Sequence, residues 1–317
     1  MKLFRNLFGR QAKEETVPPQ LPEIQGSAQA ALHEGESPVT APIAPLQTRP
    51  LPPPKAFSSP TRRIRYGQAS DVGQVRGNNQ DACLSILASV ELAGNPPPIG
   101  LFIVADGMGG HHDGEQASAV TVQTVASHVI SEIIQPHLEG REPSSEQKTI
   151  LEVLDEAVSA ANSAVQARVP NSGTTATCAV VRGDLAYIAH VGDSRAYLYA
   201  ENNLELITRD HSLVRRLQEL GQLTAEEAEN YPQRNVLYRA IGQGDSLEVD
   251  TVTRRLPPSS SLLLCSDGLW GVLKDERIVE ILASFDDPQK ACEQMISAAN
   301  ANGGPDNITA ILVRMPD

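Results

Sequence analysis

The sequence predicts an α+β fold in which antiparallel sheets are covered by helices. Strand-like and helix-like runs are segregated along the chain, whereas a parallel α/β protein would alternate them one by one. The run TATCAVVRGDLAYIAHVGDSRAYLY has the pattern of consecutive strands, and the short turn at residues 182–184 suits an antiparallel hairpin. The long helical patterns fall in two pairs, and we expect these pairs to cover the sheets.

Each element is predicted from its apolar pattern and from the turn residues that bound it. The predicted strands span residues 64–69, 82–88, 99–105, 174–182, 185–191, 196–199, 204–208, 247–254, 261–266 and 307–314. The predicted helices span residues 114–135, 146–168, 212–220, 224–230, 274–283 and 288–301. Because all of these elements follow residue 60, we expect one folded domain over residues 61–317.

The first 60 residues are predicted to be a disordered, proline-rich arm. Residues 17–60 contain eleven prolines and no periodic apolar pattern, so they cannot bury enough apolar surface to offset their conformational entropy. Ahead of them, Leu3, Phe4, Leu7 and Phe8 share one face of a short amphipathic segment that could bind a membrane surface or a partner protein. A frayed terminus is the simpler interpretation, since isolated helices this short are marginal in water.

Composition excludes several classes of function. A net charge of −13 repels nucleic acid, and only 4% of the residues are aromatic, which is few for stacking on single strands. The widely spaced cysteines predict reduced packing residues, with no disulfide framework or zinc site; they are Cys83, Cys178, Cys265 and Cys292. No apolar run has the length of a membrane span, and the start lacks a signal-peptide core. We therefore expect a cytoplasmic protein.

Five aspartates stand at the ends of predicted strands, and four of them adjoin glycine or asparagine. They are Asp106 in VADGMGG, Asp193 in VGDSR, Asp267 in CSDGLW, Asp306 in GGPDNIT and Asp81 in GNNQD. A single Asp-Gly pair usually indicates a turn. Packed sheets would, however, bring several strand ends to one edge, where carboxylates repel one another unless they are protonated or bridged by cations. The sequence therefore predicts a cation site at that edge.

The chemistry of this site follows from its donor atoms. Carboxylate and carbonyl oxygens without histidine or cysteine ligands suit Mg²⁺ or Mn²⁺. Two such ions that share a bridging carboxylate are the usual apparatus for in-line attack on phosphorus. Glycine at position 107 would let its backbone carbonyl face a metal and would leave room for a substrate.

Seven sequence blocks make the chain similar to the metal-dependent protein serine/threonine phosphatases of type 2C (the PPM family), in their compact bacterial form. The blocks lie in family order between residues 66 and 314, and they are SDVGQVRGNNQD, VADGMGGHHDGEQAS, SGTTATCAVV, AHVGDSRAYL, LITRDHSLVRRLQELGQLTAEEA, LLLCSDGLWGVL and GGPDNIT. The resemblance implies a four-layer αββα sandwich of two antiparallel sheets flanked by helices. It also implies a mobile flap over residues 209–245, beside the active site.

The resemblance assigns a first group of residues to two metal ions. Asp106 would bridge the ions, and Asp267 and Asp306 would complete the first site. The carbonyl of Gly107 would face the second ion, which Asp81 would hold largely through water. The cofactors expected are therefore two Mn²⁺ or Mg²⁺ ions.

The resemblance assigns a second group to a weaker metal site and to the substrate. Asp193 would join Asp267 at the site of a third ion. Arg76 would bind the substrate phosphate, a task that suits the fork of a guanidinium. Gln80 stands where many relatives have glutamate, so the second ion is expected to have one carboxylate fewer near it.

Four of the seven histidines lie in the matched blocks, and one of these four is a candidate catalytic residue. His111 would donate a proton to the leaving serine or threonine alkoxide, because imidazole has a suitable pKa. His112 is a weaker candidate, and neither is expected to bind metal in an oxygen-rich site. His190, in a predicted strand, and His211, in the predicted flap, are expected to be structural.

The predicted function is hydrolysis of phosphoserine and phosphothreonine monoesters by a hydroxide that bridges two Mn²⁺ or Mg²⁺ ions, without a covalent phosphoenzyme. The partners implied are phosphoproteins, among them substrates of a serine/threonine kinase or the kinase itself, with no nucleic acid. We expect a monomer. Two alternatives are a catalytically weak pseudophosphatase that binds phosphoproteins as a regulator, and an adaptor whose functional part is the arm.

Overall fold

The computed structural model describes residues 63–89, 97–109, 113–141, 148–229, 231–244 and 247–317. The arm predicted over residues 1–60 lies outside this part of the chain, so its disorder and its amphipathic start remain predictions. His111 and His112 also lie outside the described residues.

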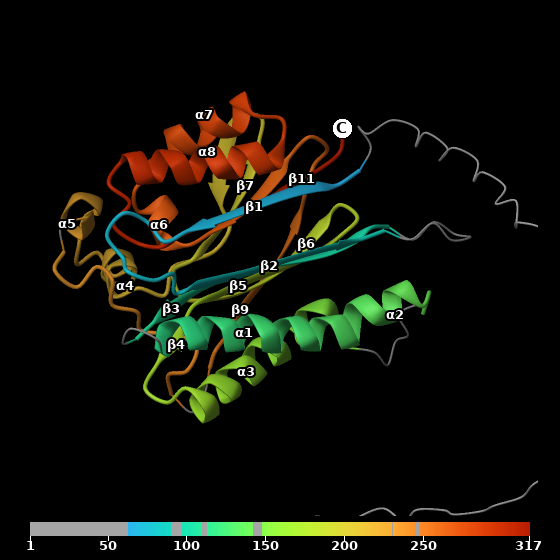
Figure 1. The fold of residues 1–317 in the computed structure, drawn as a ribbon, viewed down its shortest axis with the longest axis horizontal. Coiled ribbons are helices and arrows are strands. Elements are labelled where there is room, and N and C mark those ends of the chain that lie inside the picture. The colour runs from blue at the N-terminus through green and yellow to red at the C-terminus, as the bar shows by residue number, and fades with distance from the viewer. Residues whose placement is uncertain (1–62, 90–96, 110–112, 142–147, 230, 245–246) are drawn as a thin grey trace, which may run out of the picture. The chain divides into compact units, whose positions relative to one another are not determined.

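Two antiparallel sheets form the centre of the folded domain (Figure 1). The first has the order β1-β11-β10-β7-β8, with β1 (Arg65–Asp71), β11 (Ile308–Arg314), β10 (Ser261–Cys265), β7 (Arg195–Ala200) and β8 (Asn203–Leu206). The second has the order β2-β3-β5-β6-β9, with β2 (Asp81–Ala88), β3 (Ile99–Met108), β5 (Ala176–Arg182), β6 (Leu185–Val191) and β9 (Asp250–Arg255). The short strand β4 (Gly173–Thr174) pairs with the end of β3.

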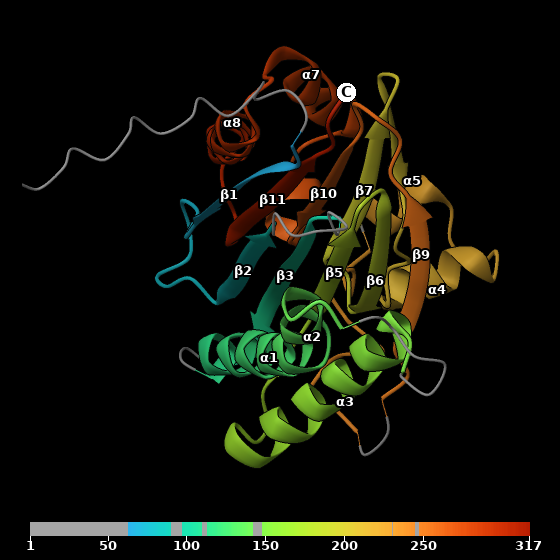
Figure 2. The ribbon, with the colours of Figure 1, turned by 90° about the vertical axis from the view of Figure 1, so that its right-hand side faces the viewer.

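Helices cover the outer face of each sheet, so the domain has the four predicted layers (Figures 1 and 2). The first sheet is covered by α7 (Asp275–Ser284) and α8 (Pro288–Ala301). The second is covered by α1 (Asp113–Val129), which continues through a π-helical turn (Ile130–Ile134) into α2 (Gln135–Leu138), and by α3 (Ile150–Arg168). Three short helices, α4 (Leu213–Glu219), α5 (Ala225–Glu229) and α6 (Asp267–Trp270), lie at one end of the sandwich.

The alternation of side chains along β3 explains why it is apolar on both faces. Ile99, Leu101 and Ile103 pack toward α1 and α3, whereas Phe102 and Val104 pack between the two sheets. Successive residues of a strand point to opposite faces, so a strand in the middle of a four-layer sandwich is buried on both. The predicted α+β sandwich is confirmed.

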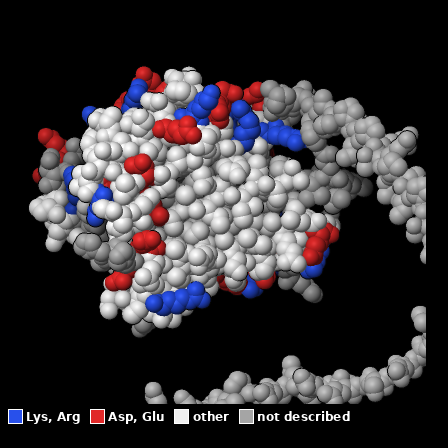
Figure 3. All heavy atoms as spheres, viewed as in Figure 1, with Lys and Arg blue, Asp and Glu red and all other residues white. Residues whose placement is uncertain are grey.

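The helix that begins at Asp113 is long and apolar enough, through Leu138, to cross a membrane by length and composition alone. Its inner face is buried on the second sheet and beside α3, as expected for the core helix of a sandwich. On the face seen in Figure 3, charged side chains lie mostly toward the margins, and the described lysines and arginines are scattered in small groups.

Candidate active site

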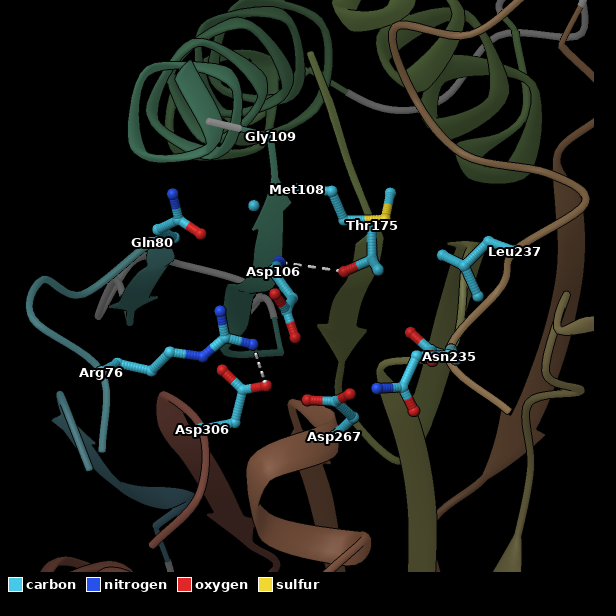
Figure 4. A pocket seen from close by; sticks show the side chains of 12 residues that line it. Arg76, Gln80, Asp106, Met108, Gly109, Thr175, Asn235, Leu237, Asp267 and Asp306 are labelled. Carbon is cyan, nitrogen blue, oxygen red and sulfur yellow. Dashed lines mark hydrogen bonds and ion pairs between the residues drawn. The ribbon is translucent and has the colours of Figure 1, made fainter. Parts of the chain in front are cut away.

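Both sheets deliver aspartates to one edge of the sandwich. In the second sheet, Asp81 at the start of β2 pairs in register with Asp106 of β3. Asp193 lies between β6 and β7, Asp267 opens α6 directly after β10, and Asp306 comes just before β11. A cavity at this edge is lined by Arg76, Gln80, Asp106, Gly107, Met108, Gly109, Thr175, Asp193, Asn235, Leu237, Asp267 and Asp306 (Figure 4).

Asp106 lies inside a strand, not after its end as the sequence suggested. β3 was expected to stop at residue 105, but it continues to Met108 because Gly107 pairs with Thr174 of β4. The backbone N–H of Asp106 donates to Thr175 Oγ1 at 2.9 Å, and its carbonyl accepts from Thr174 Oγ1 at 2.8 Å. The peptide of Asp106 is therefore held on both sides, and its carboxylate points into the cavity (Figure 4).

Gly107 is required by packing as well as by any role of its carbonyl. A Cβ atom at this position would lie 2.1 Å from the backbone oxygen of Gly114, at the start of α1. No side chain fits at that distance. The glycine therefore lets α1 approach β3 closely, directly beside Asp106.

The clustered carboxylates are electrostatically strained when no cation is among them. Burial, together with repulsion from Asp81 and Asp267, raises the pKa of Asp106 well above its ordinary range. Burial raises the pKa of Asp81 to about 7 despite a hydrogen bond from Ser266, and burial with repulsion from Asp306 raises the pKa of Asp267 to about 6. The pKa of Asp193 is also raised well above its ordinary value, again chiefly by burial.

The donor set fits divalent cations with oxygen ligands. Within the described residues, Asp81 Oδ1 and Asp267 Oδ1 are buried and have no hydrogen-bond partner. In the same part of the chain, no three acidic, histidine or cysteine side chains close around one point as ligands of a compact metal site do. The carboxylates instead surround a shared cavity, which suits ions such as Mg²⁺ that keep several water ligands.

Arg76 brings positive charge to a cavity whose other charged lining residues are aspartates. Its Nη2 donates to Asp306 Oδ2 at 2.6 Å, and this hydrogen bond raises the pKa of Arg76. The side chain is half exposed, so the guanidinium can also contact a ligand that enters from solvent. Figure 4 shows it on the opposite side of the cavity from Asn235 and Leu237.

Asn307 holds the loop that carries Arg76 and Gln80, and sequence reasoning missed it. Its Nδ2 donates to the carbonyls of Val72 and Asn78 at 2.9 Å, and its Oδ1 accepts from the backbone N–H of Gln80 at 2.8 Å. The carbonyl of Gln80 in turn accepts from Ser118 at 2.6 Å. The position of Asn307 directly after Asp306 in GGPDNIT was the sequence signal that could have identified it as part of the site.

Two other supporting hydroxyls were also missed. Ser266 Oγ donates to Asp81 Oδ2 at 2.7 Å and accepts from the N–H of Thr309 at 2.9 Å. Thr175 Oγ1, which holds the N–H of Asp106, lies 2.7 Å from Ser194 Oγ beside Asp193. These contacts link the aspartates of the two sheets.

The region predicted as a flap contributes Asn235 and Leu237 to the cavity wall, although neither residue was singled out from the sequence. His190 and His211 are buried and do not line the cavity. Burial lowers the pKa of His190 to about 4, so this ring is neutral at physiological pH.

Comparisons with known proteins agree with this architecture. The family model described as Protein phosphatase 2C matches residues 67–308. The serine/threonine protein phosphatase PstP of Mycobacterium tuberculosis is 35% identical over 260 residues, which cover 80% of this chain and 45% of PstP. The serine/threonine phosphatase stp of Listeria monocytogenes is 37% identical over 251 residues, which cover 77% of this chain and 93% of that protein.

Solved structures show the same fold. A crystal structure of the M. tuberculosis phosphatase PstP aligns with a TM-score of 0.66 and 34% identity, covering 80% of this chain and 99% of that one. The catalytic domain of PstP in complex with two manganese ions aligns with a TM-score of 0.64 and 33% identity, covering 80% and 99%. The chain spans less than half of the full PstP protein but nearly all of these structures. By its matched blocks, its fold and these relatives, the chain belongs to the protein phosphatase 2C family.

Proposed function

We propose that this chain hydrolyses phosphoserine and phosphothreonine monoesters in phosphoproteins, at the carboxylate-lined cavity. The observation that carries the proposal is the meeting of five aspartates with Arg76 at one edge, where two carboxylate oxygens are buried without a hydrogen-bond partner among the described residues. Relatives that are serine/threonine phosphatases support the enzyme and give no support to a pseudophosphatase.

The residues that would hold the ions are those the family resemblance assigned. Asp106 would contact two ions, with Asp267 and Asp306 at the first, and Asp81 and the Gly107 carbonyl at the second. Bound Mn²⁺ or Mg²⁺ would supply an activated water as nucleophile and offset the charge of the phosphoryl oxygens. The two manganese ions of the PstP catalytic domain support Mn²⁺ here. His111 is proposed as the proton donor to the leaving group.

The decisive test is hydrolysis of a phosphothreonine peptide and of p-nitrophenyl phosphate by the full chain with Mn²⁺. We expect turnover of both that stops with EDTA and returns when Mn²⁺ or Mg²⁺ is added. Binding of the phosphopeptide without release of phosphate would instead support the pseudophosphatase. Activity that persists in EDTA would contradict the role of the ions.

Arg76→Ala is expected to raise KM by about 10- to 100-fold while kcat changes little, because a charge-assisted contact to the substrate phosphate is lost. The measurement is steady-state kinetics with p-nitrophenyl phosphate. Arg65→Ala is the matched control, since Arg65 also pairs with an aspartate, Asp286, but on the surface. An effect on kcat alone would show that Arg76 does not bind the substrate phosphate.

Asp193→Ala tests the proposed third ion. At saturating Mn²⁺ we expect kcat to stay within about tenfold of the parent, because Asp106, Asp267 and Asp306 are unchanged. The Mn²⁺ concentration for half-maximal activity should rise by about tenfold. The measurement is activity against Mn²⁺ concentration. Superimposable curves for the parent and the variant would argue against a third site that uses Asp193.

The physiological setting is proposed on more general grounds. The relatives suggest phosphoprotein substrates, and we propose that these include the targets of a serine/threonine kinase in a signalling pathway. Reduced, widely spaced cysteines suit the cytoplasm. A phosphoproteome comparison between a parent strain and an Asp106→Asn strain would identify the substrates, as phosphosites that accumulate in the variant.

A further inference from the structure

His211 is buried between two segments that line the cavity, although it does not line the cavity itself. Its side chain is 1% exposed. On one side it contacts Gly192, which precedes Asp193; on the other it contacts the segment of residues 235–238. His211 therefore forms hydrogen bonds to both segments in addition to packing between them.

The first contact is a pair of hydrogen bonds to Gly192. The backbone N–H of Gly192 donates to His211 Nδ1 at 3.1 Å, and the backbone N–H of His211 donates to the carbonyl of Gly192 at 2.7 Å. A backbone amide can only donate, so Nδ1 must be the acceptor, and in the neutral ring the proton is on Nε2. His211 thus holds both polar groups of the residue before Asp193.

The loop that carries Asp193 is also held from the opposite side. Trp270 Nε1 donates to the carbonyl of Asp193 at 3.0 Å, and Arg195 stacks on the Trp270 ring with 3.4 Å between its guanidinium carbon and the ring centroid. Arg195 also forms a two-pronged ion pair with Asp210, the residue before His211. The peptide of Asp193 therefore lies between the base of the flap and α6, the helix that begins at Asp267.

The second contact fixes the flap segment that lines the cavity. The carbonyl of His211 accepts from the N–H of Tyr238 at 2.9 Å. Two residues after His211, the N–H of Leu213 donates to the carbonyl of Val236 at 2.8 Å. Ser212 and Leu237 form an isolated antiparallel bridge between these bonds. Asn235 and Leu237 are thus attached to the same short segment that holds Gly192.

The outer edge of the imidazole ring is oriented by charged neighbours. His211 Nε2 lies 3.2 Å from Asp250 Oδ2, to which its proton can be donated. Arg239 Nη1 donates to the other oxygen of Asp250 at 2.8 Å and lies 3.0 Å from Nε2, so both cationic and imidazole groups converge on one carboxylate. Gly192 and Asp250, at opposite ring nitrogens, fix the rotation of the ring.

We propose that His211 is a positioning residue that holds Asp193 and the cavity-lining flap residues Asn235 and Leu237 in one fixed arrangement. The acceptor at Nδ1 is the essential atom, because it alone ties the ring to the loop of Asp193. The inference rests on the proposed function, since the placement of Asp193 affects catalysis only if the cavity binds ions and a phosphoester.

The test compares two variants whose side-chain amides take the place of different ring nitrogens of His211. In His211→Asn the amide oxygen can take the place of Nδ1 and accept from Gly192, whereas in His211→Gln the amide reaches the place of Nε2 and leaves the Gly192 N–H without its acceptor. We expect His211→Gln to raise the Mn²⁺ concentration for half-maximal activity by about tenfold, and His211→Asn to stay near the parent. Ile281→Val, a truncation in α7 that reduces core packing away from the cavity, is the control for loss of stability.

A second readout does not depend on activity. Amide hydrogen exchange of the full chain should be faster in His211→Gln at residues 192–194 and 235–238, with β1 and β11 unchanged, and should stay near the parent in His211→Asn. The proposal is overturned if both variants behave alike in exchange and in Mn²⁺ dependence, or if Ile281→Val reproduces the Mn²⁺ shift at a matched urea midpoint. If the parent chain itself lacks phosphatase activity, the proposed function fails, while the exchange experiment still decides the positioning role.

Discussion

Asp106→Asn is expected to lower kcat for a phosphothreonine peptide by about 10³-fold or more, even at saturating Mn²⁺. The carboxylate of Asp106 points into the cavity beside Asp267, and no other residue on β3 can replace it. The amide is nearly isosteric, and the backbone of residue 106 stays fixed by Thr174 and Thr175, so the variant should keep its fold. Steady-state kinetics checks the prediction, with the exposed Asp286→Asn as a matched control.

The same variant should be more stable than the parent when metal is removed. In EDTA at neutral pH, the free energy of unfolding of Asp106→Asn should exceed that of the parent by about 1–4 kcal/mol, because the raised pKa of Asp106 makes the parent take up a proton on folding and the amide needs none. Urea unfolding measures this difference. A variant that is both inactive and less stable would mean that its fold is damaged, and kcat near the parental value would exclude Asp106 from the reaction.

The metal-free protein is expected to lose stability as pH rises from 6.5 to 8. The pKa of Asp81 is raised to about 7, and those of Asp106 and Asp193 are raised well above their ordinary values, so the folded state binds more protons than the unfolded state in this range. Stability from these protonated carboxylates is present at low pH and is lost as pH passes through the raised pKa values. The expected fall in the free energy of unfolding is about 2–4 kcal/mol.

This pH range is chosen to separate the aspartates from the buried histidines. Burial lowers the pKa of His190 from 6.5 in the unfolded chain to about 4 in the folded protein. The contribution of His190 to the free energy of unfolding therefore decreases as pH falls below 6.5 and is constant above that pH. Urea unfolding at several pH values, in EDTA and in excess Mn²⁺, is the measurement. Mn²⁺ should reverse the slope, since the ligands must be deprotonated to bind. A flat profile in EDTA would contradict the raised pKa values.

Much of the fold was predictable because its elements have clear local signals. The turn residues at 182–184 between two strand-like runs predicted the hairpin of β5 and β6, which pair antiparallel with Arg182 opposite Leu185. Thr149 and Glu152 form a capping box at the start of α3, which explains why the helix begins at Ile150 and not at residue 146. The helix α6 was not predicted, and Thr174 of β4 was assigned to the same strand as β5, since a helix of one turn and a strand of two residues have no measurable periodicity.

The charged residues of the site were predictable from the sequence. The residues and pairings that depend on contacts between distant parts of the chain were not. The aspartates were identified from strand ends and from family motifs, and the structure brings them to one edge. The extension of β3 through Asp106 was missed because it depends on the pairing of Gly107 with Thr174 of β4, which lies 67 residues further along the chain. Asn307 was missed for the same reason: its partner Gln80 is 227 residues away in sequence.

The central claim is that the carboxylates at this edge hold catalytic divalent cations through Asp106. Calorimetric titration of the EDTA-treated full chain with Mn²⁺ at pH 7.5 tests it most directly. We expect the parent to bind at least two ions per chain and Asp106→Asn to lose at least one of them, with Asp286→Asn unchanged. Equal binding by the parent and Asp106→Asn, or phosphatase activity in a parent chain that binds no Mn²⁺ or Mg²⁺, would contradict the claim.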